Sequence, residues 1–432
     1  MHLSRLLSAA IVAAAATLLS RPAAAVTINV PGDFQTIQAA LTAAAPGDLI
    51  LVAPNTYSGP QNSNLDFGGK AVTLRGTAGA AATIISCSGR GFVFDDGETG
   101  AAVVDGFTII NGNVPQNDRG GGILCINGSS PTIQNCVITH CNASYGGGMH
   151  VDASSPTLTG CAFIENCNLF SALIGAGLDC SNGSSMVITD CTFVRNDACC
   201  GSGGGGIYLG GSTATISRCT FDGNWAEGGG GIFCQHGSAT ISDCTFVRNA
   251  GDTLGGAAVS CHLGATIVIT GCVMFSNFGS SVVHSSSADV TLRSSTLILS
   301  QAALSGAGVE VNNFIGPPGH ILIERTIIAL GDGVAVRCLQ QSTATISCSD
   351  IFGNTGGDWV GCIAGQLGVN GNFALDPRFC DLRTPDLHLD AASPCLPGNH
   401  PEGAPCDLIG ALGAGCATAV APATWGAIKA RY

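Results

Sequence analysis

The chain has 432 residues, of which 16 are basic and 29 acidic, so its net charge is -13 at neutral pH. This balance argues against nucleic acid or an anionic lipid surface as a partner, since both attract basic proteins. The 22 cysteines indicate an oxidising compartment rather than the cytosol.

The first 25 residues have the parts of a secretory signal peptide. Arg5 precedes an apolar run over residues 6–19, and residues 23–25 offer a small-residue cleavage site before Val26. A membrane anchor is the alternative, but the run is short for a spanning helix and Arg21-Pro22 interrupts it. We therefore expect a secreted or cell-surface protein with no transmembrane segment after signal cleavage.

The mature chain begins with a predicted cap. Residues 36–41 form a short amphipathic pattern that predicts a helix, and the turn at 46–48 leads into an apolar strand at 49–52. A helix placed over the first strands would protect an otherwise open sheet edge.

One sequence phrase then recurs through the middle of the chain. It reads Gly-Gly-Gly-Ile, a polar turn, Thr-Ile-x-x-Cys and Phe-x-x-Asn, with one copy over residues 204–224 and the next over 229–249. The copies follow one another at steps of 23 to 31 residues, and each contains three short stretches with alternating apolar and polar residues. This pattern predicts an all-β solenoid, a right-handed parallel β-helix with three strands per coil, over residues 26–371 including the cap.

Two columns of stacked residues follow from this alignment. The small residue after Thr-Ile-x-x is expected at a tight interior corner, at Cys136, Cys161, Cys191, Cys219, Cys244, Cys272, Ser295, Thr326 and Ser349. The asparagine of Phe-x-x-Asn is expected in a turn, because Asn tolerates the left-handed conformation and can bond its own backbone. Its column is Asn166, Asn196, Asn224, Asn249, Asn277 and Asn354.

The period stops near residue 372, and a segment rich in proline and cysteine follows. Residues 372–416 are predicted to form a C-terminal cap stabilised by the local disulfides Cys380–Cys395 and Cys406–Cys416. Residues 417–432 form a linker and a basic, Trp-containing tail, either a frayed end or a docking or sorting signal.

The other cysteines suggest little cross-linking. The stacked cysteines of the repeat are expected to be mostly free buried thiols, because their side chains point in parallel. Cys141 and Cys167, at similar places in neighbouring coils, could bridge. Paired Cys-x-x-Cys spacings are missing from the sequence, so no zinc site is expected.

Over residues 26–416 the chain resembles the pectate-lyase-like superfamily of right-handed parallel β-helices. Its Gly-Gly-Gly-Ile and Phe-x-x-Asn repeats are also similar to those of the polymorphic outer-membrane proteins, which are adhesins. In enzymes of the first group, the resemblance implies a cleft on the outer face of the first strand of each coil. Fold alone does not fix function, so this face has to be examined residue by residue.

Strand alternation allows that face to be projected. If Ile207 and its equivalents point inward, the next residue in each coil points outward, which gives the column Leu124, His150, Asp179, Tyr208, Phe233, Ser260, His284 and Glu310. The candidate catalytic residues are His150, Asp179 and Tyr208, because a His beside a carboxylate can transfer protons. The candidate ligand-binding residues are Tyr145, Trp225 and Phe233, whose rings can stack on sugars.

The sequence does not complete a known catalytic set. A lyase would need a calcium-binding carboxylate cluster and a nearby Arg or Lys base, and the projected column lacks both near its centre. Asp95 and Asp96 lie one or two coils away with no matching partners. Any β-helix also presents some outward polar column without function.

The prediction that follows is a rigid binding or adhesin-like module, monomeric and without a cofactor, that recognises a glycan or another surface partner. A carbohydrate-active enzyme, either a polysaccharide lyase or a glycoside hydrolase, is the first alternative, with calcium as a cofactor if it is a lyase. A structural component of the extracellular matrix is the second alternative.

Overall fold

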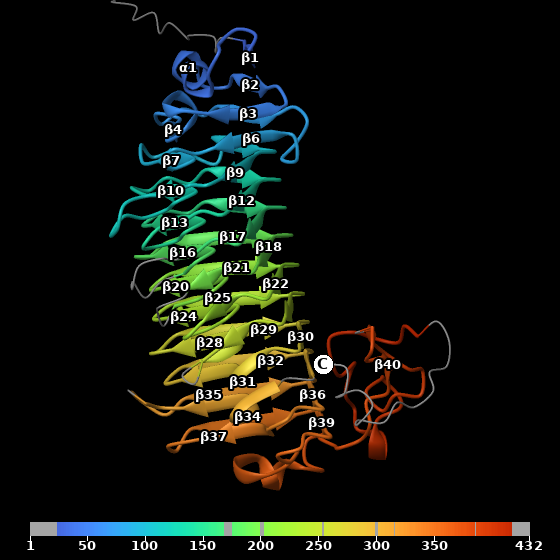
Figure 1. The fold of residues 1–432 in the computed structure, drawn as a ribbon. Coiled ribbons are helices and arrows are strands. Elements are labelled where there is room, and N and C mark those ends of the chain that lie inside the picture. The colour runs from blue at the N-terminus through green and yellow to red at the C-terminus, as the bar shows by residue number, and fades with distance from the viewer. Residues whose placement is uncertain are drawn as a thin grey trace, which may run out of the picture.

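The computed structural model describes residues 24–167, 175–198, 203–252, 255–298, 301–314, 316–384 and 386–416. Within them the chain winds into a solenoid of stacked coils built on three parallel sheets (Figure 1). The predicted β-helix with three strands per coil is confirmed. Nearly all of the predicted signal peptide and the whole of the 417–432 tail lie outside the described residues. In the part described, no helix is long and apolar enough to cross a membrane.

Each coil contributes strands to the three sheets, here called sheets A, B and C. Sheet A contains β1 (Thr27–Val30), β2 (Leu49–Val52), β5 (Thr73–Gly76), β8 (Val103–Asp105), β11 (Thr132–Gln134), β14 (Thr157–Thr159), β17 (Ser185–Thr189), β21 (Thr213–Ser217), β25 (Ser238–Ser242), β29 (Thr266–Thr270), β32 (Asp289–Arg293), β35 (His320–Glu324) and β38 (Thr343–Ser347). Sheet B contains β3 (Asn55–Ser58), β6 (Thr83–Ser86), β9 (Thr108–Ile110), β12 (Val137–Thr139), β15 (Ala162–Ile164), β18 (Thr192–Val194), β22 (Thr220–Asp222), β26 (Thr245–Val247), β30 (Val273–Phe275), β33 (Thr296–Ile298), β36 (Ile327–Ala329) and β39 (Asp350–Phe352). Sheet C contains β4 (Leu65–Asp66), β7 (Phe92–Phe94), β10 (Ile123–Cys125), β13 (Met149–Asp152), β16 (Leu178–Ser181), β20 (Ile207–Gly210), β24 (Ile232–Gln235), β28 (Gly256–His262), β31 (Phe278–Ser286), β34 (Gln301–Asn312) and β37 (Val334–Cys338), with the short strands β19 (Asp197–Ala198), β23 (Trp225–Ala226) and β27 (Ala250–Gly251) joined through β31.

The N-terminal end is covered by α1 (Ile37–Ala43), as the sequence predicted. The Thr36 hydroxyl caps the helix by accepting from the Ala39 amide, and Ile37 and Leu41 are fully buried. The side chain of Asn62, in the 3-10 helix η1 (Pro60–Asn62), accepts from the Ile37 amide and satisfies another helix-end donor.

The core consists of identical side chains stacked from coil to coil. Four phenylalanines, Phe163, Phe193, Phe221 and Phe246, stack with ring centroids 4.7 to 5.0 Å apart. Glycine is required beside this stack, because a Cβ on Gly206 would lie 2.6 Å from the Gly231 carbonyl oxygen and 2.9 Å from the Phe221 ring. The Gly-Gly-Gly-Ile phrase thus allows the coils to approach at sheet spacing.

The column of small residues lies at a buried corner as predicted. Its thiols are free, and the Cys161 amide donates to the Cys191 sulfur at 3.4 Å, a contact repeated along the column. The prediction for the asparagine column is wrong in one respect. The left-handed residue is the one before each asparagine, such as Arg195 at φ 47°, while Asn196 is fully buried. Its amide group bonds the Phe163 carbonyl of one neighbouring coil and the Asn224 side chain of the other.

The C-terminal end of the solenoid is closed by the 3-10 helix η2 (Gly361–Gln366). The Gln366 side chain accepts from the Ile346 amide and donates to the Ala344 carbonyl, so it satisfies the open edge of β38. Residues 370–373 bond to the last coil beside β39. The chain then turns back and packs beside sheet B, as Figure 1 shows for β40. This segment contains β40 (Phe379–Asp381), β41 (Asp386–Leu389) and the 3-10 helix η3 (Pro401–Gly403).

The predicted disulfide pairing of this segment is wrong. Cys380 pairs with Cys416 and Cys406 pairs with Cys348, whereas Cys395 is a free, buried thiol beside Asp350. The local pairs fail because residues 410–415 return alongside Leu389 and because Cys406 packs against the last coil. A third bridge, Cys338–Cys362, fixes η2 to β37.

The suggested Cys141–Cys167 bridge is also wrong, since Cys141 is a free, buried thiol. Cys167 aligns with Asn142 in the neighbouring coil, one residue away from Cys141. A shift of one residue turns the two side chains to opposite sides of the chain.

Candidate functional site

The projected outward column of sheet C is present. Met149, Leu178 and Ile207 point into the core, and His150, Asp179 and Tyr208 are direct register partners on β13, β16 and β20. The same column continues through Phe233, Ser260, His284 and Glu310. The three candidate catalytic residues are therefore neighbours on consecutive coils.

His150 and Asp179 form a buried pair. His150 Nδ1 lies 2.5 Å from Asp179 Oδ2, and the second Asp179 oxygen accepts from the Ser181 hydroxyl at 2.7 Å. Because the carboxylate faces Nδ1, the proton of a neutral ring lies there and Nε2 carries the lone pair. Nε2 is buried without a hydrogen-bond partner, at 4.0 Å from Asp152 Oδ2. A ligand hydroxyl reaches this nitrogen only when a neighbouring side chain moves aside.

A cleft of about 390 Å³ opens beside this pair. Its volume lies within the usual range for small-ligand sites. It is lined by Arg119, Tyr145, His150, Asp179, Ser181, Asn182, Tyr208, Gly210, Gly211, Gln235 and His236. The lining combines two aromatic rings with amide, imidazole, guanidinium and carboxylate groups.

The cleft results from an interruption in a stack of rings. Tyr208 stacks on Phe233 at 5.7 Å, and Phe233 stacks on His262 at 4.7 Å, all along one side of sheet C. At the next coil toward the N-terminus the column holds the short side chain of Asp179, so no ring among the described residues lies against the other face of Tyr208. Tyr145 lies across the gap, with its ring 6.4 Å from that of His150.

Gly210 is necessary for the position of Tyr208. A Cβ added to Gly210 would lie 2.6 Å from Cε1 and 3.0 Å from the hydroxyl of Tyr208, so the ring lies over a position where only glycine fits. The hydroxyl reaches Gln235 Oε1 at 3.3 Å. Burial raises the pKa of Tyr208 to about 12, which keeps the phenol protonated at neutral pH.

Of the three predicted ligand-binding residues, only Tyr145 lines the cleft. Phe233 is 5% exposed and supports Tyr208 from below. Trp225 lies on β23, paired with β19 and β27, and does not line the cleft.

Several lining residues were not anticipated. Ser181 and Gln235 lie two positions after Asp179 and Phe233, in a second outward column that the same alternation rule predicts. Asn182 follows directly after β16. Arg119 directly precedes the glycines at 120–122, as Tyr145 precedes those at 146–148, and the two residues pair in register. The alignment that identified Tyr145 would therefore have indicated Arg119.

Farther along sheet C the polar residues bond one another. His284 contacts the Ser260 hydroxyl through Nδ1 and the Asn312 amide through Nε2, and Ser260 also contacts His262. Glu310 pairs with Arg337. Burial lowers the pKa of His262 to about 3, and burial with the charge of Arg337 lowers that of His284 to about 4. Both rings are therefore neutral at neutral pH.

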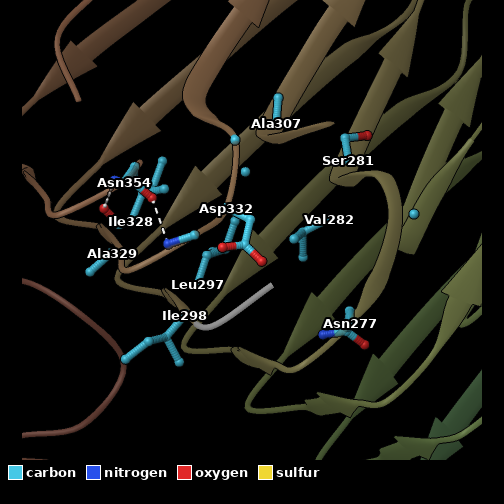
Figure 2. Close-up of a pocket in the computed structure, with 14 residues that line it drawn as sticks. Asn277, Ser281, Val282, Leu297, Ile298, Ala307, Ile328, Ala329, Asp332 and Asn354 are labelled. Carbon is cyan, nitrogen blue, oxygen red and sulfur yellow. Dashed lines mark hydrogen bonds between the residues drawn. The ribbon is translucent and has the colours of Figure 1, made fainter. Parts of the chain in front are cut away.

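Figure 2 shows a second hollow, near the C-terminal coils. Asn354 crosses one side, where its side chain accepts from the Gly331 amide and donates to the Ile328 carbonyl. The enclosed volume is about 10 Å³, roughly the space of one water molecule. This hollow is too small for a ligand.

Three acidic residues, Asp66, Asp96 and Glu98, meet near the N-terminal end of sheet C. One carboxylate oxygen from each of Asp66, Asp96 and Glu98 lies within 4.8 Å of the others. Oxygen ligands of this kind suit calcium. However, Glu98 already accepts from the Gly69 and Asp96 amides and the Ser129 hydroxyl. The trio therefore does not offer a free ligand set, and it contributes no step to the chemistry considered below.

Comparison with known proteins agrees with the architecture. The family model described as "Right handed beta helix region" matches residues 71–239, 164–297 and 205–374. A search of curated proteins finds no match.

Among solved structures, pectate lyase Pel9A is 14% identical, with 90% of this chain and 96% of that chain covered and a TM-score of 0.46. The catalytic unit of a GH87 alpha-1,3-glucanase from Streptomyces thermodiastaticus is 14% identical, with 78% and 69% covered and a TM-score of 0.36. An endo-xylogalacturonan hydrolase from Aspergillus tubingensis is 14% identical, with 77% and 90% covered and a TM-score of 0.31.

Proposed function

The chain belongs to the right-handed β-helix family, and from this premise we propose that it is a secreted or cell-surface glycan-binding module. The observation that carries the proposal is the cleft of about 390 Å³ between Tyr145 and Tyr208, above the buried His150–Asp179 pair. Aromatic faces suit the apolar face of a sugar ring, and the surrounding amides and charges suit its hydroxyls.

The rigidity of the scaffold supports this function. Each lining residue of sheet C lies on a strand paired on both sides, so the cleft is largely formed before a ligand arrives. A preformed site loses less conformational entropy on binding. The three disulfides are consistent with the oxidising, extracellular compartment that we propose.

The test is a glycan microarray followed by calorimetry of the bound glycans with the mature protein, which starts at Val26. Tyr208→Ala is expected to weaken binding about tenfold, the loss of one stacking contact. Trp225→Ala is the matched control, since this aromatic is also partly exposed but lies outside the cleft. Equal affinities for Tyr208→Ala and the native protein would contradict the proposal.

A carbohydrate-active enzyme is the second candidate, favoured by one observation. The unpartnered Nε2 of His150, oriented by Asp179, is the arrangement of a general base. Incubation with polysaccharides, with and without calcium, would reveal reducing ends or unsaturated products. Cleavage that is lost in the His150→Ala/Asp179→Ala double variant would support the enzyme, and binding without cleavage would support the binding module alone.

A further inference from the structure

The proposed site has a wall at one end. A second cleft, of about 360 Å³, lies on the neighbouring coils and is lined by Asp118, Arg119, Leu124, Ile126, Asn127, Asp152 and Ala153. Arg119 lines both clefts, and Asp152 lines the second one. Arg119 Nη1 lies 2.7 Å from Asp152 Oδ2, so an ion pair stands where the two clefts meet. We call this pair the Arg119–Asp152 bridge.

The bridge is held from both sides. The Asn182 amide donates to the other Asp152 oxygen at 2.9 Å, and the Arg119 guanidinium lies 5.5 Å from the centre of the Tyr145 ring. A half-exposed ion pair by itself contributes little and moves easily. The additional hydrogen bond and the cation–π contact tie residues from successive coils together, which makes the bridge a defined barrier.

The cleft on the C-terminal side of the bridge is short. From β13 to β24 the cleft crosses three coil spacings, about 14 Å at roughly 4.8 Å each. This length, with the volume of the cleft, accommodates about two to three sugar rings. A long chain that lay along sheet C would have to pass through the bridge.

Resting on the proposed glycan-binding function, we infer that the site takes a chain end: the terminal residues of a glycan, with the last ring against the Arg119–Asp152 bridge. A terminal sugar carries a free hydroxyl where an internal one carries a glycosidic bond. The bridge presents Arg119 to this cleft, and the remaining N–H groups of the guanidinium can donate to that hydroxyl. Beneath the bridge lies the buried Nε2 of His150, which is 4.0 Å from Asp152 Oδ2 and has no hydrogen-bond partner among the described residues.

The length of the ligand tests this inference. Calorimetry with cello-, xylo-, manno- and galacturono-oligosaccharides of two to eight units is expected to show an affinity that rises to about three units and then stays constant within twofold. Shearing a bound polymer to half its length is expected to double the protein bound per gram, because the number of ends doubles. Affinity that keeps rising to eight units, or binding indifferent to shearing, would overturn the inference.

Two variants separate the barrier from a general surface effect. In Arg119→Ala the path is open, and eight-unit chains are expected to bind at least about threefold more tightly than three-unit chains. Arg75→Ala is the matched control, because Arg75 is equally exposed in its ion pair with Asp105 but lies on sheet A. Constant affinity beyond three units in Arg119→Ala would overturn the role of the bridge. If no probe binds the native protein, the glycan-binding proposal fails and the chain-end inference fails with it.

Discussion

Sheet C contains two histidines with equal burial and opposite surroundings. His150 and His284 are each 2% exposed and belong to the same outward column, five coils apart. Both nitrogens of His284 contact protein groups, Ser260 and Asn312, whereas His150 is bonded on one side only, to Asp179. The cleft adjoins the incompletely bonded histidine. A buried polar atom without a hydrogen-bond partner destabilises the fold. A ligand-binding role for the cleft would explain why such an atom is retained beside it.

The largest loss of stability around either histidine should come from removing the Asp179 carboxylate, the partner of His150. Asp179→Ala leaves the His150 Nδ1–H unpartnered in the interior and is expected to lower the free energy of unfolding by about 3 kcal/mol. Chemical denaturation measures the change. Asp190→Ala, which removes an exposed partner of Arg218, is the control and should leave the unfolding midpoint unchanged. Equal changes in the unfolding midpoint for Asp179→Ala and Asp190→Ala would contradict the assignment of Asp179 as the buried partner of His150.

Low pH should destabilise the fold through His284, the histidine that is bonded at both nitrogens. The folded-state pKa of His284, about 4, lies below its ordinary value of 6.5, so the folded protein binds fewer protons. The stability is then complete above about pH 6.5 and falls by about 3 kcal/mol as the pH drops toward 4. Urea midpoints measured across this range should fall less steeply in His284→Gln. An identical slope in that variant would assign the acid sensitivity elsewhere.

The gap beside Tyr208 should be sensitive to a single methyl group. Gly210→Ala places a Cβ against the tyrosine ring, so the ring must shift into the cleft, and glycan affinity is expected to fall about tenfold. Gly365→Ala is the control, because no atom lies within 4 Å of its added Cβ. Calorimetry with a glycan that the microarray identifies would decide, and an unchanged affinity in Gly210→Ala would place the ligand away from Tyr208.

The smallest effect should come from the Tyr208 hydroxyl. Tyr208→Phe keeps the ring and loses the 3.3 Å contact with Gln235, so both stability and binding are expected to change by about 1 kcal/mol or less. A loss as large as that in Tyr208→Ala would mean that the hydroxyl, rather than the ring face, holds the ligand.

The sequence was sufficient for the fold and for one face of the site. The Gly-Gly-Gly-Ile and Thr-Ile-x-x-Cys phrases set the register, and strand alternation then placed His150, Asp179 and Tyr208 on consecutive coils. The same rule, continued by two residues, would have found Ser181 and Gln235.

Features outside the repeat could not be obtained in this way. The Cys348–Cys406 pair joins residues 58 positions apart, once the C-terminal segment has folded back beside sheet B. The asparagine column was misassigned because a buried side-chain ladder and an exposed left-handed turn have the same spacing. Hydrogen bonds between coils, which the sequence does not display, distinguish the two.

The most direct test of the glycan site is the 15N resonance of the histidine side chains, recorded during titration with the strongest binder from the microarray. The comparison of the two histidines predicts that His150 Nε2 shifts progressively with added glycan while both nitrogens of His284 keep their positions. A shift at His284 with none at His150, or no shift at either, would contradict the assignment of the cleft.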